Sequence, residues 1–253
     1  MRFPFPLSVV LLSVGVPCIG PSALAVTQSE VRFDGRGFRV LTINLQTDEL
    51  RVVYKHPDGS AYGNFVRLRQ GLGDKYLAAA NAGMFETNGS PTGLLKADGA
   101  IVKGVNLGTG VGNFYLKPNG VFFMTSKGAA IAESQAFARE FTGTFPSVSS
   151  ATQSGPLLVS NGKINSRLIP GSHCQQCLQY SRTAVAVISP THVAIALGLN
   201  EINFYDFAAF LLNGLHSTDA LYLDGAISKL DTLEKPTNDR KQKYAAFIAV
   251  LKR

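Results

Sequence analysis

Four short polar segments carry the side chains best suited to chemistry in this sequence. They are residues 81–86 (NAGMFE), 153–156 (QSGP), 181–183 (SRT) and 224–228 (DGAIS). Each follows directly after an apolar run or lies within one, and that placement lets a rigid sheet present reactive groups at its edge. Together they supply carboxylates, a guanidinium, an amide and hydroxyls, which suit acid–base chemistry and the binding of an anionic or hydroxyl-rich ligand.

Asp224 is the first candidate for a catalytic carboxylate. It follows an apolar run and precedes Gly225, whose backbone is free to approach a ligand closely. The alternative is a simple turn, because an Asp-Gly pair is also favoured in turns for local reasons. Glu86 is the second candidate carboxylate, and it fits an exposed loop as well as it fits a catalytic role.

Arg182 is the electrostatic candidate, because a planar guanidinium can hold two phosphate oxygens at once. A strand-edge ion pair is the alternative role. Substrate contacts are expected from nearby amide, hydroxyl and small residues, namely Asn81, Gly83, Gly155, Thr183, Gly225 and Ser228. Turn capping is a second explanation for Asn81 and Ser228.

Cys174 and Cys177 lie in the segment HCQQC. A zinc site would normally need a second pair of Cys or His ligands, which the sequence lacks nearby, so no metal is expected. A thioredoxin-like redox site would place the first Cys at a helix N-terminus after a strand, whereas Pro-Gly-Ser precedes this motif. We expect a structural clip on a long loop, which an oxidising compartment could close as a disulfide.

The elements that must position these segments are mostly strands, since β-branched and aromatic residues recur in short runs between Gly, Asn, Asp and Pro. The expected strands are 38–45, 50–54, 76–80, 113–117, 121–124, 157–160, 163–164, 183–188, 192–197, 220–223 and 244–251. Helical spacing or composition predicts helices at 64–72, 134–141 and 204–215. Hairpins are predicted to join 38–45 to 50–54, and Asn-Gly steps to join 113–117 to 121–124 and 157–160 to 163–164.

Most neighbouring strands are joined by turns too short for parallel crossovers, so the sheet should be largely antiparallel. A local parallel pairing is possible only in the stretch 201–223, which resembles strand-helix-strand. No linker or repeat interrupts the chain. The sequence therefore predicts a single α+β domain, with a largely antiparallel or mixed sheet and a few packed helices.

The first 25 residues predict an export signal. Arg2 supplies the charge, residues 7–19 form the apolar run, and Ala23-Leu24-Ala25 is a cleavage pattern. An uncleaved membrane anchor is the alternative, but the run is shorter than the roughly 20 residues needed to span a bilayer. Residues 26–253 would then form a periplasmic or secreted domain with no stable membrane insertion after cleavage.

The formal net charge is +7, or +6 without Arg2, and the basic residues are scattered along the chain. A diffuse positive balance can attract anionic glycans or phosphates, but it also describes an ordinary solvated surface. Nucleic acid is not expected as a partner, since no aromatic and basic residues interleave as a single-strand platform would need. No pattern in the sequence predicts a cofactor or an oligomeric state.

The polar segments extend into four longer motifs: NAGMF at 81–85, GPLLVSNG at 155–162, SRTAVAV at 181–187 and LYLDGAIS at 221–228. In these motifs and their order, the sequence resembles the phosphodiester glycosidase family, which includes the lysosomal uncovering enzyme and exported bacterial relatives. The resemblance implies hydrolysis of a bond between a sugar's anomeric carbon and a phosphodiester oxygen, or of a related glycosidic bond.

The expected function is therefore a glycosidase acting on phosphate-linked sugars of cell-envelope or exopolysaccharide glycans. Asp224 would stabilise the developing positive charge or act as acid and base, with Glu86 as its partner and Arg182 holding the phosphate. The alternative is a non-catalytic glycan-binding or envelope-assembly protein that uses the same pocket without turnover.

Overall fold

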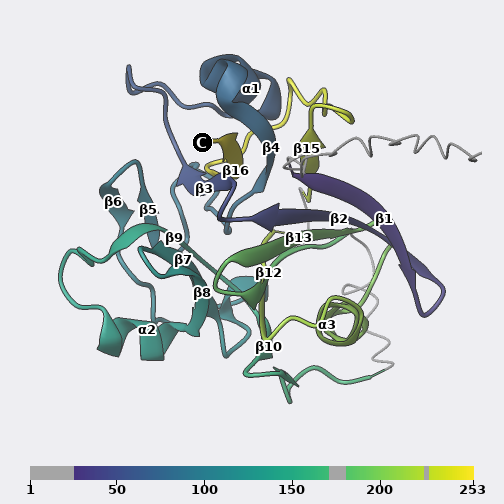
Figure 1. The fold of residues 1–253 in the computed structure, drawn as a ribbon. Coiled ribbons are helices and arrows are strands. Elements are labelled where there is room, and N and C mark those ends of the chain that lie inside the picture. The colour runs from purple at the N-terminus through teal and green to yellow at the C-terminus, as the bar shows by residue number, and fades with distance from the viewer. Residues whose placement is uncertain (1–25, 171–180, 225–227) are drawn as a thin grey trace, which may run out of the picture.

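A computed structural model describes residues 26–170, 181–224 and 228–253. The described residues form three β-sheets, and every strand pairing between them is antiparallel. Figure 1 shows the three sheets packed against one another, with a helix on the outside of each. The predicted α+β class is confirmed.

The first sheet has seven strands in the order β1-β2-β13-β12-β14-β10-β11. Its strands are β1 (Thr27–Phe33), β2 (Arg36–Asn44), β10 (Leu157–Ser160), β11 (Lys163–Ile164), β12 (Thr183–Ser189), β13 (His192–Gly198) and β14 (Asp219–Tyr222). The predicted Asn-Gly hairpin is confirmed between β10 and β11. Its Asn161 and Gly162 have positive φ angles of 49° and 69°, which is the geometry that favours these two residue types.

The second sheet has four strands in the order β15-β4-β16-β3, and the third has five in the order β6-β5-β9-β7-β8. The second contains β3 (Asp48–Val53), β4 (Tyr76–Asn81), β15 (Leu230–Thr232) and β16 (Phe247–Lys252). The third contains β5 (Leu95–Ala97), β6 (Ala100–Lys103), β7 (Gly120–Thr125), β8 (Gly128–Glu133) and β9 (Val148–Ser154).

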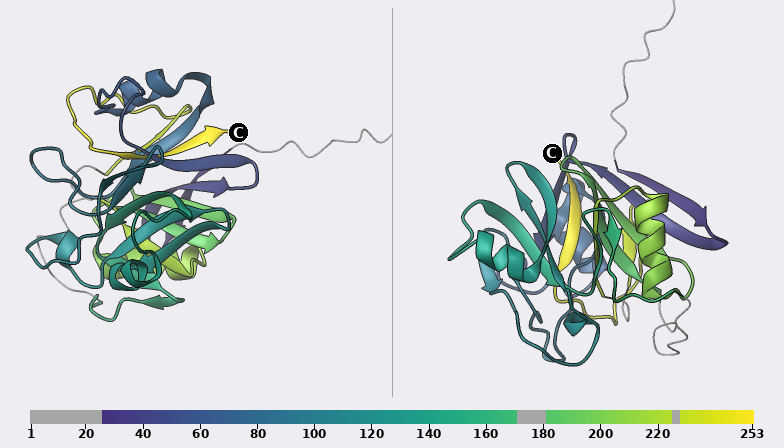
Figure 2. Two further views of the ribbon diagram at one scale, coloured as in Figure 1. Left: turned by 90° about the vertical axis from the view of Figure 1, so that its left-hand side faces the viewer. Right: turned by 90° about the horizontal axis from the view of Figure 1, so that it is seen from below.

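Each sheet has one helix on its outer face, as the views in Figure 2 show. Helix α1 (Phe65–Leu72) packs on the second sheet, α2 (Ser134–Glu140) on the third, and α3 (Phe204–Ala209) with the π-helical turn η4 (Phe210–Gly214) on the first. The α1 boundaries follow from their caps. The Asn64 side chain accepts a hydrogen bond from the Arg67 amide, and Gly73 ends the helix with φ 54°.

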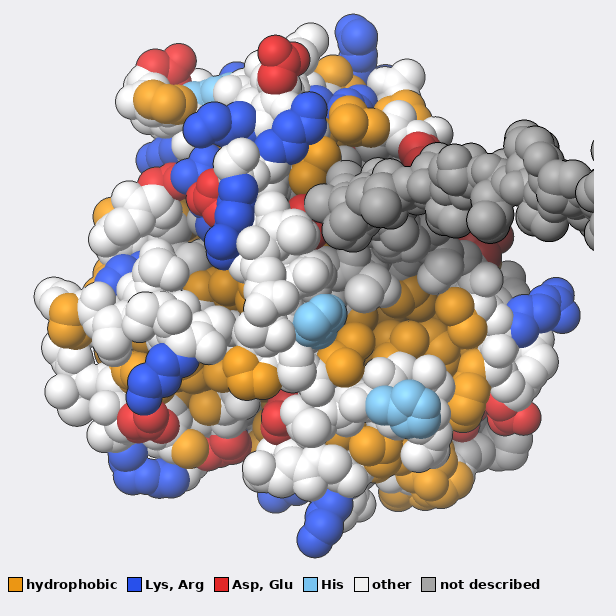
Figure 3. Space-filling model, viewed as in Figure 1, with side chains coloured by type: hydrophobic (Ala, Val, Ile, Leu, Met, Phe, Trp, Pro, Cys, Tyr) orange, Lys and Arg blue, Asp and Glu red, His pale blue; other side chains and the backbone are white. Residues whose placement is uncertain are grey.

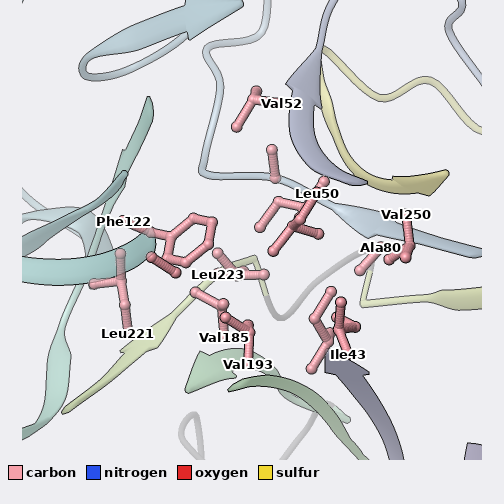
Figure 4. Packing of buried hydrophobic residues seen from close by; sticks show 14 of the residues in the cluster. Ile43, Leu50, Val52, Ala80, Phe122, Val185, Val193, Leu221, Leu223 and Val250 are labelled. Atoms are coloured by element: carbon pink, nitrogen blue, oxygen red, sulfur yellow. The ribbon is translucent and has the colours of Figure 1, made fainter. Parts of the chain in front are cut away.

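The alternation of side chains along the strands explains how three sheets share one core. In β12, Val185 and Val187 face the central cluster, while Ala184 and Ala186 face α3. The strands β7 and β16 divide their apolar residues between the central cluster and their own helix in the same way. Figure 4 shows side chains from all three sheets meeting in that central cluster.

Two predicted hairpins are wrong. Strand β2 pairs with β1 and β13, whereas the following strand β3 belongs to the second sheet and pairs with β16. Residues 113–117 contain a short 3-10 helix, η2 (Asn113–Tyr115), and β7 instead pairs with β8 and β9. The suggested parallel pairing in 201–223 is also absent, because β14 runs antiparallel to both β10 and β12.

The surface agrees with a scattered distribution of charge. On the face drawn in Figure 3, Lys and Arg side chains stand singly or in small groups beside Asp and Glu. Within the described ranges, no helix combines the length and apolar character needed to cross a membrane. The predicted export signal, residues 1–25, lies outside the described residues.

Candidate functional site

The register between β12 and β14 brings two predicted site residues together. Ala184 pairs with Tyr222, and the Leu223 amide donates to the Thr183 carbonyl at 2.9 Å. Continuing this antiparallel register by one more residue places Arg182 directly across from Asp224. Cross-strand neighbours lie on the same face of a sheet, so these two side chains leave the sheet on one side and at one end.

The face in question is the one covered by α3. Ala184 and Tyr222 both belong to the apolar cluster beneath α3, and side chains two residues apart share a face. Arg182 and Asp224 therefore extend the α3 face beyond its apolar part. The site therefore lies just beyond the start of β12 and the end of β14.

Arg182 is almost wholly enclosed by protein, with an exposed fraction of 2%. Its guanidinium carbon lies 3.8 Å from the ring centre of Phe204 and 5.4 Å from that of Tyr222, and its Nε donates to the Ile202 carbonyl at 2.5 Å. Burial lowers the pKa of Arg182, and the neighbouring Tyr222 acts in the opposite direction. The side chain is a fixed positive charge that lies over the Phe204 ring and beside Tyr222.

Tyr222 links Arg182 to Asp224. Burial raises the pKa of Tyr222 to about 12, and the Asp224 charge adds to this shift. The Arg182 charge and hydrogen bonds from the Arg182 and Asn113 side chains act in the opposite direction. The hydroxyl therefore stays protonated at neutral pH. Because Asn113 is exposed, this hydroxyl lies close to the surface even though the tyrosine itself is buried.

The raised pKa of Tyr222 predicts a specific loss of stability at alkaline pH. An unfolded tyrosine releases its proton near pH 10, whereas the folded chain retains it to about pH 12. The contribution is fully present below pH 10 and falls by roughly 1.4 kcal/mol per pH unit above it. Urea unfolding between pH 8 and 11.5 measures this slope, which we expect to be shallower in Tyr222→Phe than in the wild type. Equal slopes would show that Tyr222 ionises normally in the folded state.

The backbone that carries Asp224 is held by hydrogen bonds from three separate strands or loops. The Asp224 carbonyl accepts from Asn81 Nδ2 at 3.4 Å and from Ser228 Oγ at 2.5 Å, and the Lys229 amide donates to Asn81 Oδ1 at 3.0 Å. One residue earlier, the Leu223 carbonyl accepts from Ser154 Oγ at 3.1 Å. Asn81 ends β4 and Ser154 ends β9, so all three sheets contribute to this position.

Two predicted site glycines mark places where chain segments touch. A Cβ added at Gly83 would lie 2.2 Å from the Gln153 carbonyl oxygen, and the Gly83 amide donates to Thr152 Oγ1 at 3.1 Å. A Cβ at Gly155 would lie 2.7 Å from the Phe114 carbonyl oxygen. These glycines allow the loops around the site to pack closely on their neighbours.

Gly83→Ala is expected to destabilise the protein by about 1–3 kcal/mol, because the new methyl group meets backbone that cannot rotate away. Gly104→Ala is the matched control, since no heavy atom lies within 4 Å of a Cβ built there. Chemical denaturation of both variants checks the difference. Wild-type stability in Gly83→Ala would mean that the 81–86 segment moves freely against β9.

The other predicted site residues have different surroundings. Glu86 lies in an exposed turn, where its amide donates to the Ser90 carbonyl at 2.8 Å, and its carboxylate forms no hydrogen bond or ion pair with the described residues. Thr183 is buried on the core-facing side of β12, and its hydroxyl has no hydrogen-bond partner among the described residues. Gly225, Cys174 and Cys177 lie outside the described residues.

Sequence reasoning missed Tyr222, Asn113 and Phe204, although all three surround Arg182 or its partner. Tyr222 was counted only as part of an apolar strand, but its spacing of two residues from Asp224 placed both side chains on one face. The sequence holds no comparable signal for Asn113 or Phe204. In the described ranges, no three His, Cys, Asp or Glu side chains form a cluster suited to a metal ion.

Solved structures share this arrangement of sheets. The catalytic domain of zebrafish N-acetylglucosamine-1-phosphodiester alpha-N-acetylglucosaminidase, auto-inhibited by its pro-peptide, matches with a TM-score of 0.57 and 16% identity, over 90% of this chain and 81% of that one. A hypothetical protein from Synechocystis matches with a TM-score of 0.52 and 16% identity, over 90% of this chain and 62% of the other. The fold is thus one that a glycosidase catalytic domain also adopts.

Sequence comparison adds the family. A family model described as phosphodiester glycosidase matches residues 74–250. The uncharacterized protein YigE of Escherichia coli (strain K12) is 30% identical over 191 residues, which cover 75% of this chain and 72% of YigE. The chain belongs to the phosphodiester glycosidase family.

Proposed function

We propose that this protein hydrolyses the glycosidic bond between a sugar and a phosphodiester in cell-envelope or exopolysaccharide glycans. Membership of the family and the shared fold support a hydrolase of the glycosidase kind. The observation that carries the proposal is the register that sets Arg182 across from Asp224, at a position where all three sheets contribute strand ends.

Asp224 is the proposed catalytic carboxylate. Cleavage at an anomeric carbon passes through an oxocarbenium-like state, which a nearby carboxylate stabilises by charge or by direct attack. Hydrogen bonds from Asn81 and Ser228 fix the backbone of Asp224 and so help to orient its carboxylate. Because Asp224 is only half-buried, a substrate can still reach it. In this proposal Asn81 and Ser228 act by orienting Asp224, in addition to any contact with sugar hydroxyls.

A strong general acid is less necessary here than in cleavage of an ordinary glycoside. The departing group is a phosphomonoester whose second pKa is near 6, so the oxygen that leaves the anomeric carbon needs no proton at neutral pH. This makes an exposed Glu86 compatible with activity, and its proposed role as the partner of Asp224 remains a prediction.

Arg182 contributes electrostatics in this scheme. Its positive charge lies beside the Tyr222 hydroxyl, and the Asp224 charge acts on the same hydroxyl. A direct clamp of Arg182 on a phosphate remains a prediction. Only 2% of the residue is exposed and its Nε donates to the Ile202 carbonyl, so any such contact would use the other guanidinium nitrogens. Charge fixed in a buried position still stabilises a developing negative charge at the site entrance.

The proposed location is the periplasm or the cell exterior. The basic start, apolar run and Ala-x-Ala pattern of residues 1–25 support export, and envelope glycans are the phosphate-linked sugars such a protein would meet.

The test is hydrolysis by purified residues 26–253 of a panel of sugar-1-phosphodiesters in water enriched in ¹⁸O. We expect free sugar and a phosphomonoester, with the label in the sugar, because water replaces the phosphate at the anomeric carbon. Label in the phosphate would indicate cleavage of the P–O bond and contradict the proposal. Binding of the panel without release of sugar would favour the glycan-binding alternative.

A further inference from the structure

A groove of about 340 Å³ lies at the same end of the first sheet as the candidate site, on the face opposite α3. Its walls include Arg39, Ser181, Ser228, Lys229, Lys235 and Thr237. Ser181 directly precedes Arg182, and Ser228 is the residue whose hydroxyl binds the Asp224 carbonyl. The groove is therefore continuous along the chain with both residues that define the site.

Two rigid walls form the groove. One is the end of the first sheet, where Arg39 of β2 pairs with Leu197 of β13, and both residues line the groove. The other is the segment 228–237, which Asp231 anchors by accepting hydrogen bonds from the Thr237 amide and from Arg69 Nη1, each at 2.5 Å. Because each wall is tied to a sheet, the hollow is preformed.

The charge of the groove is positive. Arg39, Lys229 and Lys235 bring three cations to its lining, and the lining itself contains no carboxylate. The nearby Glu30 lies 3.3 Å from Arg39 Nη2 and 2.8 Å from Lys235 Nζ. Hydrogen bonds from Lys235 and Arg39 lower the pKa of Glu30, so it is ionised and offsets one of the three charges. Lys229 is exposed and forms no ion pair within the described part of the chain.

The position of Lys229 is fixed although its side chain is exposed. Its amide donates to Asn81 Oδ1 at 3.0 Å, and the same Asn81 side chain donates to the Asp224 carbonyl. Arg182, by contrast, is buried against the Phe204 ring. The exposed cation nearest to Asp224 along the described chain is therefore Lys229, which lines the groove.

We propose that this groove is the subsite for the anionic half of the substrate, the phosphate and the group it carries beyond the scissile bond. A volume of about 340 Å³ lies at the small end of the range for ligand pockets and suits one phosphorylated unit of a glycan. Leu197, Leu199 and Pro236 supply apolar surface for its carbon skeleton. This inference rests on the proposed function, because it assigns the leaving group of the same reaction.

Calorimetric titration tests the groove without relying on turnover. The probes are inorganic phosphate, glucose 6-phosphate and glucose, added to purified residues 26–253 in low-salt buffer. Both phosphates should bind and glucose should not, and added NaCl should weaken binding because the cations are partly solvated. Tighter binding of glucose 6-phosphate than of inorganic phosphate indicates that the groove holds the ester and not the bare ion.

Three variants locate the binding. Lys229→Gln and Lys235→Gln should each weaken phosphate affinity by about five-fold, the effect of losing one exposed cation. Glu30→Gln should tighten it by a similar factor, because it releases Arg39 and Lys235 from their shared carboxylate. Lys127→Gln, in the turn between β7 and β8, is the control and should not change it. Wild-type affinity in all three groove variants, or no binding by the wild type, would overturn the inference.

The test of the groove and the test of the proposed reaction can fail independently. Hydrolysis of sugar-1-phosphodiesters with no change in Lys229→Gln or Lys235→Gln would keep the proposed reaction and reject this subsite. Phosphate binding that follows the three variants, in a chain that releases no sugar, would keep the subsite and reject the reaction.

Discussion

Asp224→Asn is expected to lower kcat/KM for sugar-1-phosphodiester hydrolysis by about 10³-fold, within the range found for groups that act directly in acid–base or charge stabilisation. The amide has nearly the same shape as the carboxylate but no charge. The backbone of residue 224 should keep its position, since Asn81 and Ser228 bind its carbonyl and not its side chain. Initial rates of sugar release measure the effect.

Two accompanying variants make the Asp224 result specific. Asp98→Asn removes a carboxylate from an exposed turn with φ 51°, a conformation that Asn tolerates, and should leave the rate unchanged. Asp224→Glu keeps the charge but displaces it, and should recover only part of the activity. A rate in Asp224→Asn within ten-fold of wild type, in a chain with a normal melting temperature, would remove Asp224 from the proposed mechanism.

Asp231→Ala is expected to cost about 3–5 kcal/mol of unfolding free energy, the range for breaking a buried ion pair at one partner. Asp231 is fully buried and binds Arg69 Nη1 and the Thr237 amide at 2.5 Å, and the Tyr76 hydroxyl donates to its other oxygen. The substitution leaves the Arg69 charge, whose side chain is 21% exposed, without its carboxylate. Equilibrium urea unfolding measures the loss.

Asp74→Ala is the control for Asp231, because Asp74 is an exposed carboxylate in the same part of the fold. It should change stability by less than about 0.5 kcal/mol. Asp231→Asn, which keeps the shape and part of the hydrogen bonding, should fall between the two. A loss below about 1 kcal/mol in Asp231→Ala would mean that the segment 231–237 is not held through this carboxylate.

Local features of the fold could be predicted from the sequence because short stretches of chain determine them. The α1 helix was identified by its apolar spacing and the glycines at its end, and the cap at Asn64 agrees with that assignment. The β10–β11 hairpin followed from an Asn-Gly pair that readily adopts positive φ angles. Short apolar runs on either side of residues 189–191 also indicated β12 and β13, which form a hairpin next to the site.

Strand partners were harder to predict, because alternation shows which face is buried but not which strand lies alongside. The short gap between β2 and β3 suggested a hairpin, yet β3 crosses to another sheet and pairs with β16, about 200 residues later. The arrangement of the site was hard to predict for the same reason, because it depends on which strands are neighbours. Asp224 and Arg182 were identified as separate strand-end residues, whereas their opposition depends on the β12–β14 register.

The residues that support the site were the least visible in the sequence. Ser154 lies in the polar segment 153–156 and had no role of its own in the sequence analysis, but its hydroxyl donates to the Leu223 carbonyl. Phe204 is an ordinary helix residue until α3 lies on the first sheet and its ring covers Arg182. Such roles arise from tertiary contacts between segments distant in sequence, which a single sequence does not specify.

The place of β16 has a consequence for the order in which the molecule is assembled. Residues 247–252 form an interior strand, bonded to β4 on one side and to β3 on the other. Until that strand is inserted, β3 and β4 each expose an unpaired edge, which other chains can recognise. A polypeptide that stalls or is cleaved before residue 247 would therefore be prone to aggregate through these two strand edges.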